Sequence, residues 1–330
     1  KVDMRQGKVI GAEALIRWLD PEIGLIMPSQ FLHFIQNSSA DIVLGEWVIQ
    51  EALRQTNEWR RTGLNLVVSV NISAYHLAQE NFVSRLKTFL GTYPELPAHC
   101  LEIEILETAA LEDIGHITAL MAECHELGVD FALDDFGTGY SSLAYFKRLP
   151  ATTLKIDQSF IRDMLHDDDD LAIVDGIIGL SQAFRRTVIA EGVETIEHGV
   201  RLLHMGCDLA QGYGFARPMP ADEFTSWLAV WRPDAALKLA ASVQSSPADY
   251  GLLFAEHDHR RWFHDLEAFL LANPESGICP PSLDKHHCRL GQWIDGVGSR
   301  RFSHLQKFTL IDPLHEKLHA TGQTLVKLHE

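Results

Sequence analysis

Short apolar runs recur along the first two thirds of the chain, and longer stretches with apolar residues at helical spacing separate them. The predicted strands are residues 9–18, 66–73, 101–106, 129–135, 153–157, 187–191 and 209–215. Amphipathic helices are expected between nearly all of them, for example at 42–60, 114–127, 171–184 and 196–205. Strand alternating with helix over roughly 220 residues indicates a parallel sheet, and about eight such units indicate a closed (β/α)8 barrel of the α/β class.

Nearly every predicted strand carries a polar residue within its length or just past its end. The carboxyl ends of barrel strands meet at one mouth, so these side chains are expected to converge. Carboxylates with neutral amide oxygens are typical of a site for a hard cation such as Mg²⁺ or Mn²⁺. The residues concerned are Glu13, Asn71, Glu104, Glu107, Asp134, Asp135, Lys155, Asp157, Glu191 and Gln211.

Asp134 and Asp135 are adjacent at the end of one predicted strand, before a turn rich in glycine. Neighbouring carboxylates repel each other and are costly unless a cation lies between them. A simpler interpretation is that one aspartate caps the next helix while the other faces water. Similar alternatives exist elsewhere, since Lys155 could pair with a buried aspartate and Glu191 could cap a helix. The recurrence of acidic strand ends favours the cation site.

Several of these residues lie in motifs that resemble a known family. Glu13-Ala14-Leu15, within residues 11–18, resembles the signature of EAL-domain cyclic di-GMP phosphodiesterases. The resemblance covers about residues 1–230 and keeps the family's motif order. The other motifs are Val70-Asn71-Ile72-Ser73, residues 101–108, Asp134-Asp135-Phe136-Gly137, Leu154-Lys155-Ile156-Asp157, Ala190-Glu191-Gly192-Val193-Glu194 and Ala210-Gln211-Gly212-Tyr213.

The resemblance implies metal-dependent hydrolysis of cyclic di-GMP to linear 5′-pGpG, and it assigns a role to each matching residue. One divalent ion would be held by Glu13, Asn71, Glu104 and Asp134, and a second by Asp134, Asp135 and Glu191. Gln211 matches the last donor at the mouth, acting directly or through water. Lys155 matches the lysine that contacts the attacking water. The resemblance places Leu15, Arg17, Asp157 and Gln211 at the substrate, and it implies that Glu107 and Glu194 support the metal-bearing loops.

Two departures from the family leave another function open. Leu106 stands where the family usually has threonine, and Lys1 falls inside the expected first strand, which predicts a truncated barrel and a fragment of a longer protein. An upstream sensory or GGDEF-type domain, or a membrane anchor, is compatible with such a fragment. The alternative function is a catalytically impaired barrel that binds cyclic di-GMP as a receptor.

Composition predicts a soluble, intracellular protein of two domains, and the resemblance implies the bacterial cytoplasm. Hydrophobic residues make up 46% of the chain, but the sequence contains no apolar run of about 18 residues, the length needed to span a membrane. The five cysteines are scattered, as expected for reduced thiols. The net charge of -17 disfavours a nucleic-acid polymer as partner. An acidic cleft would also repel a phosphate substrate unless bound cations reverse the local charge.

The character of the chain changes after residue 232. We predict an EAL barrel at 1–232, a linker or connecting helix at 233–250 and a helical domain at 251–330. Nine of the 17 histidines lie in that last segment. His315 and His319 are four residues apart, so a helix would place them on one face, close enough to bind one ion.

This last segment resembles the CZB family of zinc-binding modules first recognised on chemoreceptors. The family pattern of His-x-x-Trp, Cys-x-x-Gly-x-Trp and His-x-x-x-His is present in order, and the matching zinc ligands are His259, Cys288, His315 and His319. The pattern predicts a zinc sensor that regulates the barrel, in a bundle truncated at its C-terminal end, with a homodimer as the expected assembly. The alternatives are a histidine-rich helical surface, a core cysteine packed as a small apolar group, and a plain dimerisation bundle.

Overall fold

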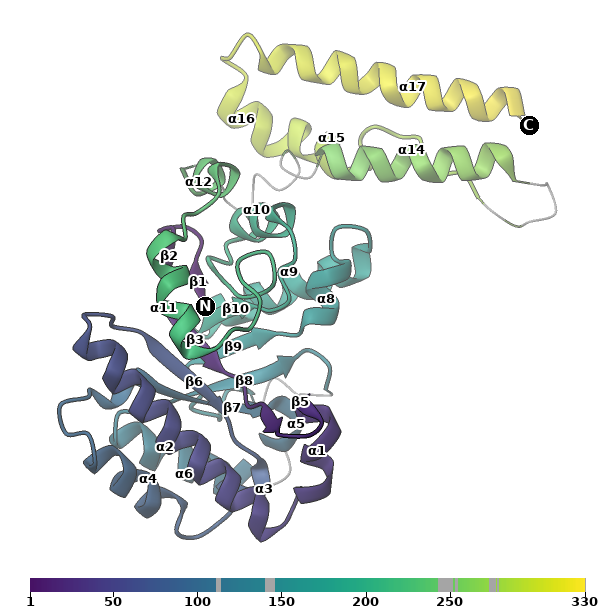
Figure 1. Ribbon diagram of the computed structural model, residues 1–330. Coiled ribbons are helices and arrows are strands. Elements are labelled where there is room, and N and C mark those ends of the chain that lie inside the picture. The colour runs from purple at the N-terminus through teal and green to yellow at the C-terminus, as the bar shows by residue number, and fades with distance from the viewer. Residues whose placement is uncertain are drawn as a thin grey trace. The chain divides into compact units, whose positions relative to one another are not determined.

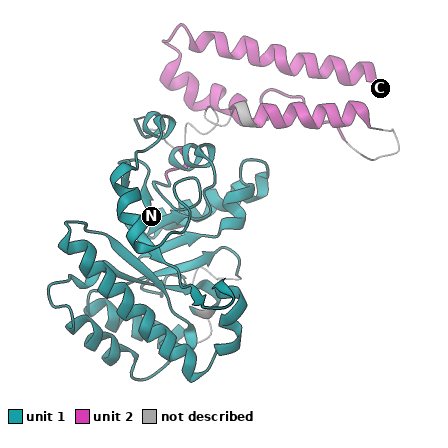
Figure 2. Ribbon diagram, viewed as in Figure 1, with its two compact units in different colours: residues 1–203, 207–242 teal, residues 204–206, 243–330 magenta. Residues whose placement is uncertain are grey.

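The computed structural model describes residues 1–110, 114–139, 146–242, 252, 255–272, 277 and 279–329. The chain divides into two compact units (Figure 2), one of residues 1–203 and 207–242 and the other of residues 204–206 and 243–330. Residues 243–250 of the predicted linker lie outside the described residues. None of the described helices is both long enough and apolar enough to span a membrane.

The first unit contains a sheet of nine strands that curls into a nearly closed barrel (Figure 1). Its order is β2-β1-β11-β10-β9-β8-β7-β6-β3. The strands are β1 Val2–Asp3, β2 Lys8–Val9, β3 Gly11–Ala14, β6 Val67–Asn71, β7 Leu101–Leu106, β8 Asp130–Phe136, β9 Thr153–Ile156, β10 Thr187–Ala190 and β11 Leu209–Ala210. All pairs from β3 round to β11 are parallel, which confirms the predicted barrel class.

The start of the chain differs from the predicted single strand at 9–18. β1 pairs antiparallel with both β11 and β2, because the chain reverses through a short turn in which Gly7 has φ 64°. The backbone then enters β3 and leaves the sheet after Ala14. The two edges of the sheet approach each other at Lys1, whose backbone nitrogen donates to the Gly11 carbonyl oxygen at 2.8 Å.

Helices flank the barrel, and most of them bury apolar residues. They are α1 Pro28–Ile35, α2 Ser39–Arg61, α3 Ala74–Leu77, α4 Phe82–Gly91, α5 Glu107–Ala110, α6 Ile114–Glu126, α8 Gln158–Asp163, α9 Asp168–Ala183, α10 Ile196–Met205 and α11 Ala221–Val230. A hairpin of β4 Trp18–Asp20 and β5 Gly24–Ile26 precedes α1. Helix α12, Ala235–Ser242, also belongs to this unit and buries Leu237 and Ala240.

The second unit is helical, as predicted. It contains α14 Ala255–Leu271, α15 Arg289–Trp293, a π-helical turn at Ile294–Gly298, α16 Ser299–Phe302, a short 3-10 turn at Phe308–Leu310 and α17 Ile311–His329. Its core has one cluster of Trp262, Leu266 and Val326, and another of Leu290, Trp293 and Ile294. Gly322 of α17 lies so close to Trp262 of α14 that a Cβ atom there would be 2.4 Å from the ring.

Candidate active site and metal centres

The parallel register brings the acidic residues of different strands together inside the barrel. Asn71 of β6 pairs with Glu104 of β7, and Glu13 of β3 is level with Ser69 of β6. Alternate residues of a strand face the same side. Glu104 and Lys155, which is on β9, are both wholly buried, with relative exposures of 0%. The strand ends therefore form one polar cluster around Lys155, where the sequence predicts a site.

Lys155 lies among four carboxylates. Its Nζ is 2.6 Å from Glu191, 2.9 Å from Asp134 and 3.5 Å from Glu13, and it also contacts Glu104. Burial alone would lower the pKa of Lys155, but the charges of these carboxylates, Glu104 foremost, hold that pKa well above its usual value. In the metal-free protein Lys155 is therefore a cation and a hydrogen-bond donor.

Glu13 is fixed by two side-chain amides, one at each oxygen. Asn71 Nδ2 donates to Glu13 Oε1 at 2.7 Å, and Gln211 Nε2 donates to Glu13 Oε2 at 2.7 Å. Gln211 Nε2 also donates to Glu191 Oε1 at 2.8 Å. Burial and the charge of Glu104 raise the pKa of Glu13. The amides hold the carboxylate in position, and their carbonyl oxygens remain suitable as neutral metal ligands.

Asp134, Asp135 and Glu191 offer oxygens that all lie within 4.8 Å of one another, so they could hold one cation. Asp135 has a left-handed φ of 51°, at an irregularity in the pairing of β8 with β9. Such backbone strain is concentrated at functional sites. Burial, with the charge of Asp134, raises the pKa of Asp135 to about 6. Burial also raises the pKa of Glu191 to about 8, against the opposing charge of Lys155. Burial and, after it, neighbouring anions thus make both carboxylates prefer a proton or a cation.

The loop after β8 is held by Glu107, which is buried and accepts a hydrogen bond from the Gly137 amide at 2.8 Å. Glu194 is exposed near Arg162, outside the cluster around Lys155. Asp157 caps α8 by accepting from the Ser159 amide at 2.9 Å. This hydrogen bond is a structural role for Asp157 beside the predicted substrate role.

The predicted substrate residues Leu15 and Arg17 follow the end of β3. Leu15 is largely exposed, and Arg17 donates to the Ile16 carbonyl oxygen at 2.7 Å. A cavity of about 690 Å³ opens beside Arg17, and its lining includes Trp18, Phe31 and Trp47. A planar, partly apolar ligand would find aromatic walls beside a cation there.

Polar residues deeper in the barrel than this cluster were not predicted from the sequence. Lys1 extends into the barrel and contacts both Glu102 and Glu104. The available signal was Glu102 itself, which lies two positions before Glu104 and so faces the same side of β7. Six carboxylates then share the site with two ammonium groups: Glu13, Glu102, Glu104, Asp134, Asp135 and Glu191 with Lys1 and Lys155. Four formal negative charges remain, and two divalent cations would balance them. The hard oxygen donors fit Mg²⁺ or Mn²⁺.

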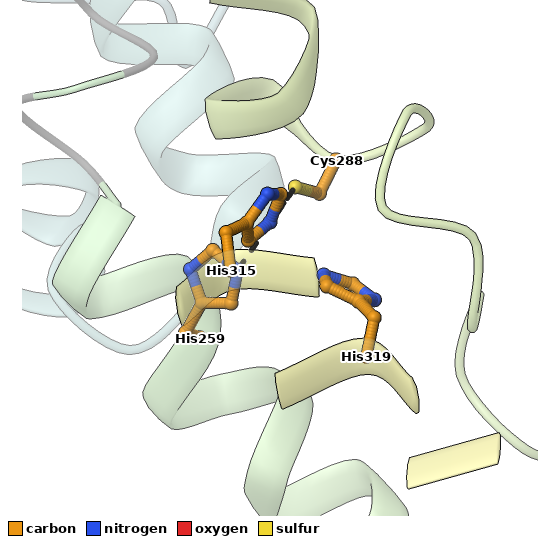
Figure 3. A group of neighbouring side chains, drawn as sticks. All are labelled: His259, Cys288, His315 and His319. Carbon is orange, nitrogen blue, oxygen red and sulfur yellow. Dashed lines mark hydrogen bonds between the residues drawn. The ribbon is translucent and has the colours of Figure 1, made fainter. Parts of the chain in front are cut away.

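The second unit brings His259, Cys288, His315 and His319 together, within 4.8 Å of one another (Figure 3). They come from α14, from the residue that precedes α15 and from successive turns of α17. Cys288 Sγ is 3.1 Å from His315 Nε2 and 3.9 Å from His259 Nε2. Three imidazoles and one thiolate are a donor set that fills the tetrahedral coordination of zinc.

The state of these side chains also fits a metal. The Nδ1 atom of His259 lies 2.6 Å from the Ala255 carbonyl oxygen, an arrangement that points Nε2 at the cluster. His315 and His319 are buried, and burial lowers the pKa of both, to about 4 for His315. Neutral imidazoles are the form that binds metal. In contrast, His286, His287 and Cys279, which match no zinc ligand, are exposed.

Each of the two parts of the chain matches a known protein family. The EAL domain family matches residues 1–218, and the chemoreceptor zinc-binding domain family matches residues 259–326. The chain is 40% identical over 230 residues to the bifunctional diguanylate cyclase/cyclic di-GMP phosphodiesterase MucR of Pseudomonas aeruginosa, covering 69% of this chain and 33% of that protein. It is 39% identical over 224 residues to the cyclic di-GMP phosphodiesterase PdeR of Escherichia coli, covering 67% of this chain and 33% of that protein. The chain therefore spans about a third of the length of these relatives.

Solved structures show the same likeness. The MucR phosphodiesterase in complex with c-di-GMP aligns with a TM-score of 0.65 at 40% identity, covering 68% of this chain and 90% of that one. The EAL domain of Mycobacterium smegmatis DcpA aligns with a TM-score of 0.58 at 33% identity, covering 70% of this chain and 93% of that one.

Proposed function

This chain belongs to the EAL domain family, with a chemoreceptor zinc-binding domain after the barrel, and we propose that it hydrolyses cyclic di-GMP to linear 5′-pGpG. The observation that carries the proposal is the surplus of carboxylates around Lys155, in which Asp134, Asp135 and Glu191 already lie within 4.8 Å of one another. The relatives named as cyclic di-GMP phosphodiesterases support it.

We assign Glu13, Asn71, Glu104, Asp134, Asp135, Glu191 and Gln211 to two Mg²⁺ or Mn²⁺ ions. Bound divalent cations would supply a hydroxide at neutral pH and charge stabilisation of the phosphate. Glu13 is orientated by Asn71 and Gln211, and Glu107 holds the loop that follows Asp134 and Asp135. These contacts keep the carboxylates in a fixed arrangement before substrate arrives.

Lys155 and Arg17 are the cationic side chains that we assign to the reacting groups. Lys155 lies among the proposed metal ligands and orientates the attacking water by donating a hydrogen bond from its ammonium group. We assign Arg17 to a phosphate oxygen of the substrate, and the cavity beside it, walled by Trp18, Phe31 and Trp47, would take a guanine base. Leu15 and Asp157 would line the remaining substrate surface.

The test is to incubate the chain with cyclic di-GMP and to separate the products by liquid chromatography. Linear 5′-pGpG should form with Mg²⁺ or Mn²⁺, and Ca²⁺ should support the reaction poorly because its loose coordination does not hold an in-line geometry. A Cys288→Ser variant, run in parallel, separates the effect of a chelator on the barrel from its effect on zinc. Undiminished hydrolysis in excess chelator would contradict the proposal, and binding without cleavage would identify a receptor instead.

We further propose that zinc bound by His259, Cys288, His315 and His319 regulates this activity. The four ligands leave no coordination position for substrate water, so the site is suited to structure or sensing and not to catalysis. Loss of the ion would remove one link between α14 and α17, because the ligands lie on both helices, while the apolar contacts of Trp262 and Leu266 with Val326 remain. A homodimer in the bacterial cytoplasm is the setting that we expect for such a sensor.

A further inference from the structure

A second layer of polar side chains lies in the barrel interior, two residues earlier along each strand than the residues of the proposed metal site. Ser69, Glu102 and Thr153 stand two positions before Asn71, Glu104 and Lys155, and all three are buried. Ser69 Oγ donates to Glu102 Oε1 at 2.7 Å, and Thr153 Oγ1 donates to Glu102 Oε2 at 3.0 Å. Glu102 is therefore anchored at both oxygens within the barrel.

Lys1 connects this lower layer with the upper one. Its side chain is only 4% exposed, and its ammonium contacts Glu102 while lying 2.9 Å from Glu104 Oε1. Lys155 contacts the other oxygen, Glu104 Oε2. Each oxygen of the wholly buried Glu104 thus faces one ammonium group, and Glu102 anchors the ammonium below.

A buried carboxylate held in this way cannot turn without breaking an ion pair in a medium of low dielectric constant. Outer partners of a metal-binding carboxylate typically contribute 10–100-fold to metal affinity or activity. We propose that Lys1, supported by Glu102, is a positioning residue that fixes the orientation of Glu104 for the catalytic cations. This inference rests on the proposed function and assigns that site a supporting layer.

A purely structural role is the competing explanation, because Lys1 also neutralises Glu102, and an unpaired buried carboxylate is strongly destabilising. The double variant Lys1→Met/Glu102→Gln separates the two roles. The double variant removes both charges of the Lys1–Glu102 pair, so no unpaired carboxylate is left buried at position 102. Glu104 still loses its contact with the Lys1 ammonium. Glu102→Gln alone keeps Lys1 against Glu104, and Lys8→Met, at an exposed lysine of β2, is a matched control.

The experiment measures Mn²⁺ affinity by calorimetric titration of the full chain, thermal unfolding without divalent ions, and turnover of cyclic di-GMP. Lys1→Met and the double variant should both bind Mn²⁺ about 10–100-fold more weakly. The double variant should unfold at a temperature close to that of the wild type, and Lys8→Met should keep the wild-type affinity. Glu102→Gln keeps the ammonium but removes the charge of its anchor, so it should lose less affinity than Lys1→Met.

Recovery of Mn²⁺ affinity in the double variant would show that Lys1 only neutralises Glu102. Unchanged or tighter Mn²⁺ binding by Lys1→Met would likewise overturn the proposal. If the wild type binds Mn²⁺ and cleaves cyclic di-GMP in the same assays, either result leaves the proposed function standing. A wild type that neither binds Mn²⁺ nor turns over substrate would contradict the proposed function itself.

Discussion

Glu13 shows how single side chains set the properties of this site. It lies within hydrogen-bonding distance of Asn71 and Gln211 and among like charges. Glu13→Gln keeps the volume and removes a charge, so we expect turnover to fall by more than about 100-fold, beyond the effect of an outer partner. The melting temperature should stay equal or rise, because a buried charge is lost. Steady-state rates and thermal unfolding test both, and a near-normal rate would remove Glu13 from the ligand set.

Lys155 should behave differently from the ligands. Without it, four carboxylates lose their shared cation, and removal of one partner of a buried pair typically costs 3–5 kcal/mol, so metal-free Lys155→Met should lose about that much stability. Mn²⁺ should restore most of the loss, because it replaces the missing positive charge. Turnover should still be sharply reduced, since the water has lost its donor. A variant that binds no Mn²⁺ would show that Lys155 builds the metal site instead.

The residues of the cluster around Lys155 could be predicted from the sequence, because each lies at or near the end of an apolar strand. The contacts among them were not, because they depend on how the barrel closes. Lys1 is the clearest example. Its partners, Glu102 and Glu104, lie about a hundred residues away in sequence and meet it only across the interior.

Strands and helices were predicted well where one side is apolar and buried, as in β7, β9 and α6. The resemblance placed a strand at Lys1, but the antiparallel direction of β1 was not predicted, because a strand of two residues carries no periodicity. Its direction follows from the turn at Gly7 and from pairing with β11, which only the assembled sheet can supply.

At the level of elements, the close contact of α14 with α17 should control zinc binding. Gly322→Ala places a methyl group 2.4 Å from the Trp262 ring and pushes apart the helices that carry His259 and His319. We expect zinc affinity, measured by competition with a chromophoric chelator, to fall about 10-fold or more, as for other supporting contacts of a metal site.

Gly176→Ala in α9 is the control, because no atom lies within 4 Å of the new Cβ there. It should raise stability by up to about 1 kcal/mol through helix propensity alone and leave zinc affinity unchanged. Equal zinc affinities in Gly322→Ala and the wild type would show that the helix spacing tolerates the extra methyl group.

At the scale of the whole molecule, the acidic barrel should respond to pH. The folded pKa of Glu191, about 8, lies above the ordinary value of 4.5, so the folded state keeps a proton that the unfolded chain releases. The stability that this proton provides is fully present below about pH 4.5 and is lost as the pH rises towards 8. Metal-free protein should therefore melt at a lower temperature at pH 8 than at pH 6. Glu191→Gln should show a weaker dependence over that range, and an identical dependence would contradict the assignment.

Zinc should act on the whole molecule as well. When zinc is titrated into the wild type, the phosphodiesterase rate, the substrate affinity or the oligomeric state should change. Cys288→Ser should not respond, because that variant lacks one of the four ligands. Tight zinc binding with none of these changes would reduce the second unit to a static bundle.

The ammonium of Lys155 also has a consequence for the evolution of such barrels. It acts as a resident counterion, so the interior keeps partial charge compensation even without divalent ions. Folding is thereby separated from catalysis. A descendant that exchanges one acidic ligand for a neutral side chain would lose turnover while retaining the barrel and its nucleotide-binding surface. A single substitution can therefore convert an enzyme with such an ammonium group into a receptor that binds the nucleotide without cleaving it.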